Sequence, residues 1–201
     1  PIARPHPLWS EQSPDDWWSA TRTALAELRS AQPSAYRAAR SIGLSGHMHG
    51  ATLLDAADRV LRPAILWNDG RSHAQCAELE ARVPESRRIT GNVAMPGFTA
   101  PKLMWVAEHE PQVFARVARV LLPKDYLRLK LIGEAVSDMS DSAGTLWLDV
   151  AHRAWSDDML AATGLSRAQM PRLVEGSAAS GTLLPEIAAE LGLERDVVVA
   201  G

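Results

Sequence analysis

Two short polar clusters hold the side chains in this sequence that are best suited to binding chemistry. The first is rich in imidazole, and the second combines an indole, an amide and a carboxylate. In chain order these side chains are His47, Met48 and His49, then Trp67, Asn68 and Asp69. Together such groups can donate and accept several hydrogen bonds. They predict a small pocket for a ligand that carries several hydroxyl groups, with the indole as one wall.

The two histidines of the first cluster admit three interpretations. His47 and His49 stand two residues apart, so a strand or loop can place both on one side. They could begin a metal site, but no cysteine or further histidine is close in sequence, and one aspartate does not complete a ligand set. A histidine hydrogen-bonded within its loop and a histidine that contacts a substrate are also compatible with this spacing. We assign no metal ligand.

Other polar motifs have ordinary structural interpretations as well. Residues 67–69 can form a helix cap with a packed aromatic side chain instead of a pocket. Asp138 and Asp141 lie on either side of Ser140, and two nearby carboxylates can act as acid and base. Such residues more often cap helices, so we expect no catalytic role for them. The sequence contains no nucleophile elbow, P-loop or dinucleotide-binding fingerprint.

Two apolar runs must position the two clusters. Residues 42–45 and 63–66 are expected to be short buried strands, each of which ends where a polar cluster begins. Ligands bind at the carboxyl ends of strands in open α/β sheets. Two neighbouring strand ends would bring the clusters together, so we expect these two strands to lie side by side.

Helical and strand patterns alternate along the rest of the chain, which predicts the α/β class. Pro14 after Ser13 predicts a helix to about residue 30. Its apolar face is expected to consist of Trp17, Ala20, Ala24, Leu25 and Leu28. Further helices are expected at 69–83, 85–91, 100–109, 123–131, 156–163 and 185–191. Strands are expected at 36–45, 117–122, 135–138, 146–149 and 196–201, with a hairpin at 51–61.

The composition limits the classes of protein and partner. A chain of 201 residues that is 46% hydrophobic can build a substantial core in one large domain or two small ones. A net charge of -3 without a basic run argues against a nucleic-acid partner. The single cysteine, Cys76, excludes an internal disulfide and fits a reducing compartment. No apolar stretch approaches the ~20 residues of a membrane span. We therefore expect a cytoplasmic protein with no membrane partner.

The two ends of the chain are unusual. It begins at Pro1 rather than at methionine, and it stops at Gly201 directly after an expected strand. We expect a fragment of a longer polypeptide. A sheet that lacks some of its strands exposes unpaired edges, which favour self-association, so a homodimer is possible.

One longer motif points to a family. Residues 97–109 place Lys102 and Trp105 within a pattern that resembles the first signature of the FGGY carbohydrate kinases. The resemblance covers nearly the whole chain. The dipeptide Met48-His49 is specific to one branch, because family members that act on glycerol carry a different pair there. Segments that look like bacterial members acting on D-xylulose are 5–12, 48–55, 121–129 and 137–141.

The resemblance implies a fold and a reaction. Members of the family fold as two domains of the actin/hexokinase (ribonuclease H-like) type, with the sugar and ATP in the cleft between them. The implied reaction transfers the γ-phosphoryl group of Mg²⁺-bound ATP to the 5-hydroxyl of D-xylulose. Residues 1–201 would form most of the first, sugar-binding domain, truncated at both ends, without the second, ATP-binding domain. Neither ATP nor Mg²⁺ is expected to bind this segment alone.

The resemblance also implies roles for the two clusters. Met48 and His49 contact the sugar, Trp67 lines the sugar site, and Asn68 and Asp69 lie near it. The residues that are expected to be architectural instead are Lys102, Trp105, Lys124 and Tyr126.

Two parts of the family pattern are missing from this chain. The Asp-x-Gly-Thr turn that grips phosphate and metal belongs upstream of Pro1. The catalytic aspartate, in a Gly-Gly-Gly-Asp-Asn run, belongs beyond Gly201. We therefore assign no catalytic residue and expect the segment to be inactive by itself. The alternatives are a kinase of another ketose or polyol, such as ribulose or glycerol, and a non-catalytic sugar-binding module.

Overall fold

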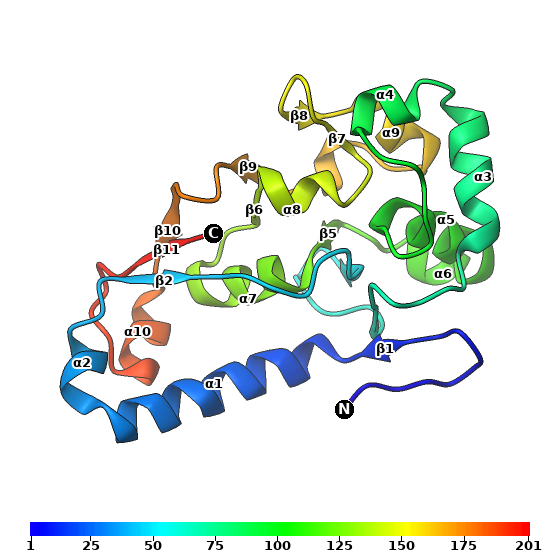
Figure 1. Ribbon diagram of the computed structural model, residues 1–201. Helices are drawn as coiled ribbons and strands as arrows, with labels where there is room; N and C mark the ends of the chain where they lie inside the picture. Colours follow the sequence, from blue (N-terminus) through cyan, green and yellow to red (C-terminus); the bar gives the residue numbers. More distant parts are fainter.

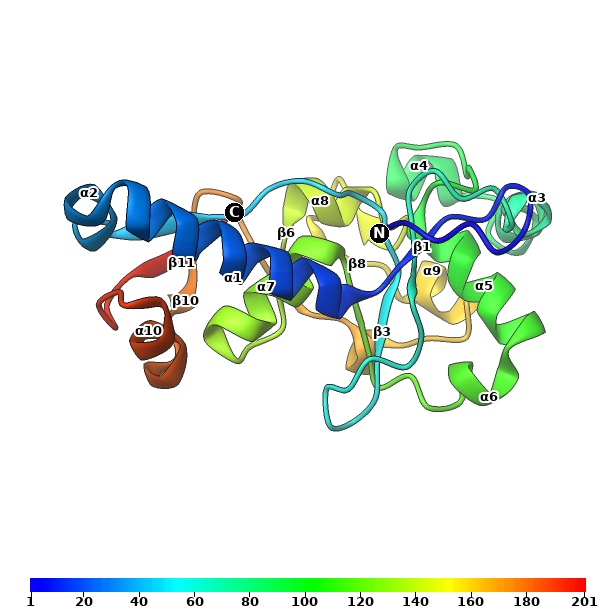
Figure 2. The same ribbon diagram turned by 90° about the horizontal axis from the view of Figure 1, so that it is seen from below.

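The computed structural model describes residues 1–201 as an elongated molecule in which helices and strands alternate (Figure 1). The helices, in chain order, are α1 (Pro14–Ala31), α2 (Pro33–Arg37), α3 (His73–Arg82), α4 (Ser86–Thr90), α5 (Thr99–His109), α6 (Pro111–Phe114), α7 (Pro123–Ile132), α8 (Met139–Ala143), α9 (Asp157–Ala162), the 3-10 helix η1 (Arg167–Gln169) and α10 (Pro185–Leu191). Helices α2 and α10 lie at one end of the molecule, and α3, α5 and α6 lie at the other (Figure 2). The predicted α/β class is confirmed.

The strands are short and form five small sheets. In chain order they are β1 (Glu11–Gln12), β2 (Ser41–Gly43), β3 (Thr52–Leu54), β4 (Ala64–Ile65), β5 (Arg119–Leu121), β6 (Val136–Asp138), β7 (Leu148–Asp149), β8 (Ala154–Trp155), β9 (Arg172–Val174), β10 (Ala179–Thr182) and β11 (Val198–Ala200). The largest sheet has the order β10-β11-β2, with β11 and β2 parallel. The other sheets are the antiparallel pairs β1–β4, β3–β5 and β7–β8 and the parallel pair β6–β9.

The main hydrophobic core surrounds α5. Every residue from Thr99 to Val106 is buried, so this helix is enclosed on all sides rather than along one stripe. Leu103 belongs to a cluster of 19 buried residues that also includes Leu53 of β3 and Trp147. Because protein interiors are close-packed, such a helix cannot shift without repacking its neighbours. Its first turn is therefore a fixed point for the loops that contact it.

Helix α7 joins the two smaller cores. Leu131 and Ile132 pack in a cluster of 8 buried residues with side chains of β11 and α10. Tyr126 and Leu129 pack in a separate cluster of 4 with side chains of β3 and β5. The Tyr126 hydroxyl also donates a hydrogen bond to the Asp15 carboxylate at 2.7 Å, which ties α7 to the first turn of α1.

Helix α1 begins as predicted, with Pro14 in its first turn and two aspartates beside its N-terminus. The predicted apolar face is only partly correct. Trp17 and Leu25 are partly buried because they face α7 and α10. The residues of that face that are exposed are Ala20, Ala24 and Leu28. Most of α1 therefore lies on the surface along one side of the molecule (Figure 1).

The strand predicted at residues 36–45 is wrong over most of its length. Pro33 begins α2, and Tyr36 within that helix donates a hydrogen bond to the carbonyl of Leu191 at 3.1 Å. A proline in the first turn favours a helix start. Only Ser41–Gly43 forms a strand, and its residues are exposed or partly buried rather than buried.

The two strands expected to lie side by side belong to different sheets. Strand β2 pairs with β11, whereas β4 pairs with β1 and bridges to Ala51. The helix predicted from residue 69 starts at His73, with Ser72 at its N-cap. The Asp69 carboxylate pairs with Arg71 instead of capping the helix.

The other long helices agree with the sequence patterns to within one or two residues. The hairpin at residues 51–61 is confirmed as well, because Leu61 N–H donates to the Leu53 carbonyl and Asp55 N–H donates to the Arg59 carbonyl. No helix combines the length and the apolar character that crossing a membrane requires.

Candidate functional site

The first candidate cluster lies on a strained loop that leaves β2. His47 and His49 have left-handed backbone angles, with φ of 53° and 63°, and Gly46 has φ of 98°. For a residue with a side chain this conformation costs roughly 1–2 kcal/mol. Such strain persists only where the surrounding structure over-determines the backbone. The contacts of His49 show what holds it.

The imidazole of His49 is fixed in one direction and in one tautomer. Its Nδ1 lies 2.9 Å from the carbonyl oxygen of Gly144. A carbonyl can only accept, so Nδ1 carries the proton and Nε2 is left with a free lone pair. The ring edge packs on Phe98, with ring centroids 4.7 Å apart. Burial lowers the pKa of His49, and the Lys102 charge lowers it further despite the Gly144 hydrogen bond. The ring is therefore neutral near pH 7, with Nε2 as an acceptor.

The two histidines of this loop contact different elements. The His47 ring packs edge-on against Trp17 of α1, with centroids 5.5 Å apart, whereas His49 packs against the start of α5. Burial lowers the pKa of His47 too, and the charge of Lys102 adds to the effect. His47 is thus a packing residue between the loop and α1, and His49 is the histidine that is held with a free ring nitrogen.

The backbone of His49 is clamped to the first turn of α5. Its carbonyl oxygen accepts hydrogen bonds from the Thr99 hydroxyl at 3.1 Å and from Lys102 Nζ at 2.9 Å. Lys102 Nζ also donates to the carbonyl of Gly97 at 2.7 Å. Lys102 is 0% exposed, which is rare for lysine. Burial lowers its pKa to about 7, and the nearby Asp69 carboxylate opposes that shift.

The second candidate cluster meets the first at Gly97. A Cβ on Gly97 would lie only 2.7 Å from the carbonyl oxygen of Trp67, so the two backbones touch and no side chain fits there. The same Gly97 carbonyl is held by Lys102, which also holds His49. The backbones of His49 and Trp67 therefore both contact the segment that begins α5. The Trp67 side chain is 53% exposed.

Asp69 is buried, and local partners occupy its carboxylate. It accepts hydrogen bonds from Ser10 N–H at 2.6 Å and from the Arg71 backbone and guanidinium at 2.7–3.0 Å. The Arg71 guanidinium stacks 3.7 Å from the Trp9 ring and also contacts Glu11 at 2.7 Å. This network anchors the loop that carries Trp67, and it leaves the Asp69 carboxylate without a free oxygen for a ligand.

Met48 and Asn68 border different hollows. Met48 is 47% exposed and borders a hollow of about 360 Å³ near the ends of β2, β6 and β11. Asn68 is exposed and borders a separate hollow of about 560 Å³ that is otherwise lined by residues 4–10. Met48 and Asn68 therefore do not line one hollow, contrary to the single pocket expected from the sequence.

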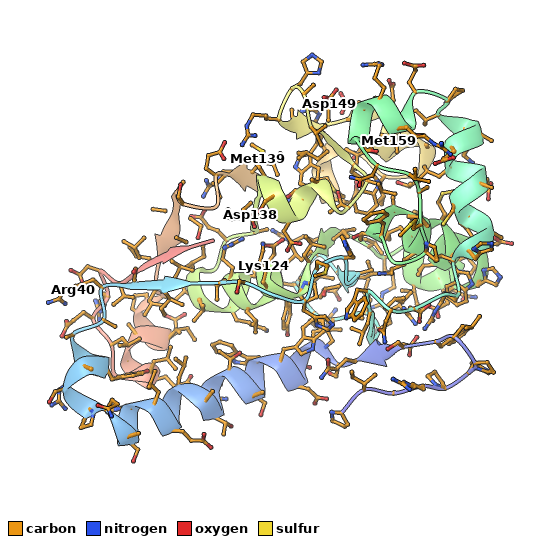
Figure 3. The ribbon with its side chains drawn as sticks, viewed as in Figure 1. Arg40, Lys124, Asp138, Met139, Asp149 and Met159 are labelled. Carbon is orange, nitrogen blue, oxygen red and sulfur yellow. The ribbon has the colours of Figure 1, made fainter.

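A buried ion cluster forms the floor of the Met48 hollow. Lys124 and Asp138 face each other (Figure 3), with Lys124 Nζ 2.7 Å from the Asp138 carboxylate. The same nitrogen lies 2.7 Å from Asp125 and 3.3 Å from Asp141. Burial raises the pKa of Asp141 to about 6, against the attraction of Lys124. Burial also opposes ionisation of Asp138, but hydrogen bonds from Lys124 and Ser140 hold the pKa of that carboxyl well below its usual range.

The expected capping role is confirmed for one of these carboxylates. Asp138 Oδ2 accepts hydrogen bonds from the backbone N–H of Ser140 at 3.0 Å and of Asp141 at 3.1 Å, at the start of α8. Its other oxygen faces Lys124. The charges of this cluster are thus directed at each other and at a helix end.

Sequence reasoning missed three residues that shape the site. Lys102 was expected to be architectural, which agrees with its buried bonds to the carbonyls of His49 and Gly97, but its link to the His49 loop was not foreseen. Phe98 belongs to the signature segment but carried no binding signal. Gly144 lies in a run of small residues, and a Cβ there would overlap the His49 ring. The apolar and small residue types at 98 and 144 offered no signal, since their roles depend on a contact across the chain.

Comparisons with known proteins agree along the entire chain. The model of the FGGY family of carbohydrate kinases, N-terminal domain, matches residues 1–201. The xylulose kinase of Escherichia coli strain K12 is 60% identical over 200 residues, which are 100% of this chain and 41% of that protein. The chain therefore spans about 41% of the length of that relative.

Two solved structures show the same fold. The crystal structure of a xyloylose kinase from Brucella ovis is 62% identical with a TM-score of 0.97, and the match covers 100% of this chain and 41% of that one. The xylulose kinase from Rhodospirillum rubrum is 32% identical with a TM-score of 0.95, over 100% and 42% of the two chains. The expected actin/hexokinase-type (ribonuclease H-like) fold is confirmed. This chain belongs to the FGGY family of carbohydrate kinases, whose N-terminal domain it matches over its full length.

Proposed function

We propose that this chain is the sugar-binding domain of a longer kinase, truncated at both ends. That kinase transfers the γ-phosphoryl group of ATP to D-xylulose, gives D-xylulose 5-phosphate, and serves pentose metabolism in the cytoplasm. The observation that carries the proposal is identity of 60% with a xylulose kinase over the whole of this chain. The fixed imidazole of His49, which leaves one ring nitrogen as an acceptor, supports it from the geometry.

In this proposal the two clusters divide the work of binding. His49 Nε2 accepts a hydrogen bond from a sugar hydroxyl, and a hydroxyl so paired is costly to replace by an apolar group. Met48 and the Trp67 indole form apolar walls against the carbon chain of the ketose. Asn68, which borders a separate hollow, is left out of this contact set, and Asp69 contributes by holding the Trp67 loop through its bonds to Ser10 and Arg71.

The chemical step needs groups that we place outside these residues. Phosphoryl transfer requires alignment of the reactants, a metal ion on the phosphates and a carboxylate that accepts the hydroxyl proton. The buried carboxylates near the site already pair with Arg71 or Lys124. They do not fit the role of metal ligands or of a free base. We therefore place the base beyond Gly201, and ATP and Mg²⁺ on parts of the longer protein.

A coupled ATP assay on the full-length protein tests this proposal. We expect turnover with D-xylulose at a kcat/KM at least tenfold above the values for D-ribulose and glycerol. A preference for ribulose or glycerol would replace the proposed substrate. The isolated segment 1–201 should show no turnover, and robust turnover by the segment would contradict the placement of the base.

A non-catalytic sugar-binding module is the second candidate, since the segment holds the sugar-facing residues without the base. Calorimetry with D-xylulose, in the absence of ATP, separates the two. Binding by the full-length protein without any turnover would favour the module.

A further inference from the structure

We propose that Lys102 is a positioning residue of the sugar site. Its side-chain nitrogen ties the loop of His49 to the turn at Gly97, and so sets the direction of the His49 imidazole relative to the Trp67 wall. This inference rests on the proposed function, because the imidazole is assigned there to a sugar hydroxyl. Lys102 itself has no exposed surface and does not contact the sugar.

The first support is the geometry of two converging hydrogen bonds. Lys102 Nζ donates to the carbonyl of His49 at 2.9 Å and to the carbonyl of Gly97 at 2.7 Å. These two carbonyls come from segments that are 48 positions apart in the sequence. The Gly97 backbone in turn touches the Trp67 carbonyl. One buried nitrogen thus links the His49 backbone and the Gly97 turn, which touches Trp67, to the buried part of α5.

The second support is the strain in the loop that Lys102 holds. The left-handed angles of His47 and His49 need an external constraint, and the His49 carbonyl receives two donors from the first turn of α5. Gly144 and Phe98 hold only the ring. If the backbone donors were removed, the ring contacts alone would have to resist relaxation of the loop.

The third support is the charge environment. The groups that face Lys102 are Asp69 and Arg71 from the segment after β4, and His47 and His49 from the segment after β2. Burial among these partners brings the pKa of the Lys102 amine to about 7. The neutral amine still has two N–H groups for its two carbonyl acceptors. A lysine placed here for fold stability alone would be expensive compared with an apolar residue of similar length.

The test compares Lys102→Met, His49→Ala and the double variant in the full-length protein. Lys102→Met keeps the length of the side chain and removes the donors. We expect it to raise the KM for D-xylulose and the calorimetric Kd about threefold to tenfold, the range for loss of the neutral hydrogen bond between His49 and a sugar hydroxyl. With His49 already replaced by alanine, the same substitution should change both constants less than about threefold, because Lys102 acts through His49. An equal effect in both backgrounds, or no effect in the first, overturns the proposal.

Two further variants separate positioning from general loss of stability. Leu160→Ala removes a fully buried side chain of the same core, far along the chain in α9. It should lower the melting temperature and leave the KM for D-xylulose unchanged. Thr99→Val removes the other donor to the His49 carbonyl and keeps the shape. If Lys102→Met does not fold, Thr99→Val must raise the KM about fivefold, and no change in it would overturn the clamp.

A readout without substrate keeps this inference separate from the proposed function. Histidine-selective 15N labelling reports the imidazole tautomer, and His49→Ala assigns the signal. We expect the Nδ1–H tautomer in the parent protein and a mixture in Lys102→Met. Absence of xylulose turnover in the parent would sink the proposed function, while an unchanged His49 signal in Lys102→Met would sink the positioning role.

Discussion

The ring nitrogen Nδ1 of His49 lies 2.9 Å from the carbonyl oxygen of Gly144, a residue 95 positions further along the chain. This contact fixes the imidazole proton on one nitrogen and leaves the other as an acceptor. It is possible only because residue 144 has no side chain, since a Cβ there would overlap the His49 ring.

Gly144→Ala should therefore displace the imidazole. The φ of Gly144 is -75°, which alanine adopts freely, so the substitution tests the contact and not the backbone. We expect the Kd for D-xylulose to rise at least tenfold. Gly43→Ala is the matched control, because a Cβ at that position meets nothing within 4 Å. Equal binding by the two variants, measured by calorimetry, would contradict the role given to Gly144.

Sugar binding should weaken at acid pH because of His49. Burial lowers the pKa of its ring, so the neutral form with a free Nε2 persists below the ordinary titration range of histidine. As the pH falls through that lowered pKa, Nε2 gains a proton and stops accepting. We expect the KM for D-xylulose to rise on the acid side and to be flat from there to pH 8. The His49→Ala variant should lack the acid rise, and retention of it would assign the effect to another group.

The stability of the protein should rise with pH above neutrality because of Lys102. Burial lowers its pKa from about 10.5 to about 7. Above pH 7 the unfolded chain therefore holds one more proton than the folded chain, and the free energy of unfolding increases with pH. The slope for one proton approaches about 1.4 kcal/mol per pH unit. Below pH 7 the amine is protonated in both states and the slope vanishes.

Urea unfolding between pH 7 and 9 measures this slope. The upper limit avoids Cys76, whose pKa burial raises to about 11 and which acts in the opposite direction above pH 9. The control is Lys102→Met, which should lose the increase. Parallel stability curves for the two proteins would show that the amine does not titrate in this range.

Asp69→Asn should destabilise the fold. Asp69 and Arg71 are both almost fully buried, and removal of the Asp69 charge leaves the Arg71 guanidinium with only Glu11, which Arg62 also engages. Loss of a buried hydrogen-bonded partner costs about 1–3 kcal/mol. The matched control is Asp157→Asn, whose partner Arg167 is largely exposed, and it should change the unfolding midpoint little. The midpoint in urea measures both, and similar values for the two variants would refute the network around Arg71.

Local patterns in the sequence were sufficient for most helices. The proline at residue 123 and the glycine at residue 133 bound α7 as expected, since Gly133 takes the left-handed angle that ends the helix. The pattern failed at residues 36–45, where a short helix is held by the hydroxyl of Tyr36 on a carbonyl of α10. That contact joins distant parts of the chain, and no local signal records it.

The candidate site was predictable in its parts but not in its assembly. The types of His49 and Trp67 pointed to a binding site, and strand ends were expected to bring them together. In the structure β2 and β4 belong to different sheets. The His49 backbone is bonded to Lys102, Lys102 is bonded to Gly97, and Gly97 lies against the Trp67 carbonyl. Bonds from a side chain to remote backbone carbonyls have no sequence period, so spacing alone cannot indicate them.

The enclosed position of α5 has a practical consequence for changing which sugar such a kinase accepts. Residues that touch the ligand are the usual targets for altered selectivity. Here the orientation of the His49 ring depends on buried residues of α5 that do not touch the ligand. Libraries that vary positions 99 and 102 of this helix, with the recognition histidine left intact, would change the orientation of that ring. The preference among ketoses of similar size would then change, while the His49 imidazole that accepts the hydrogen bond is kept.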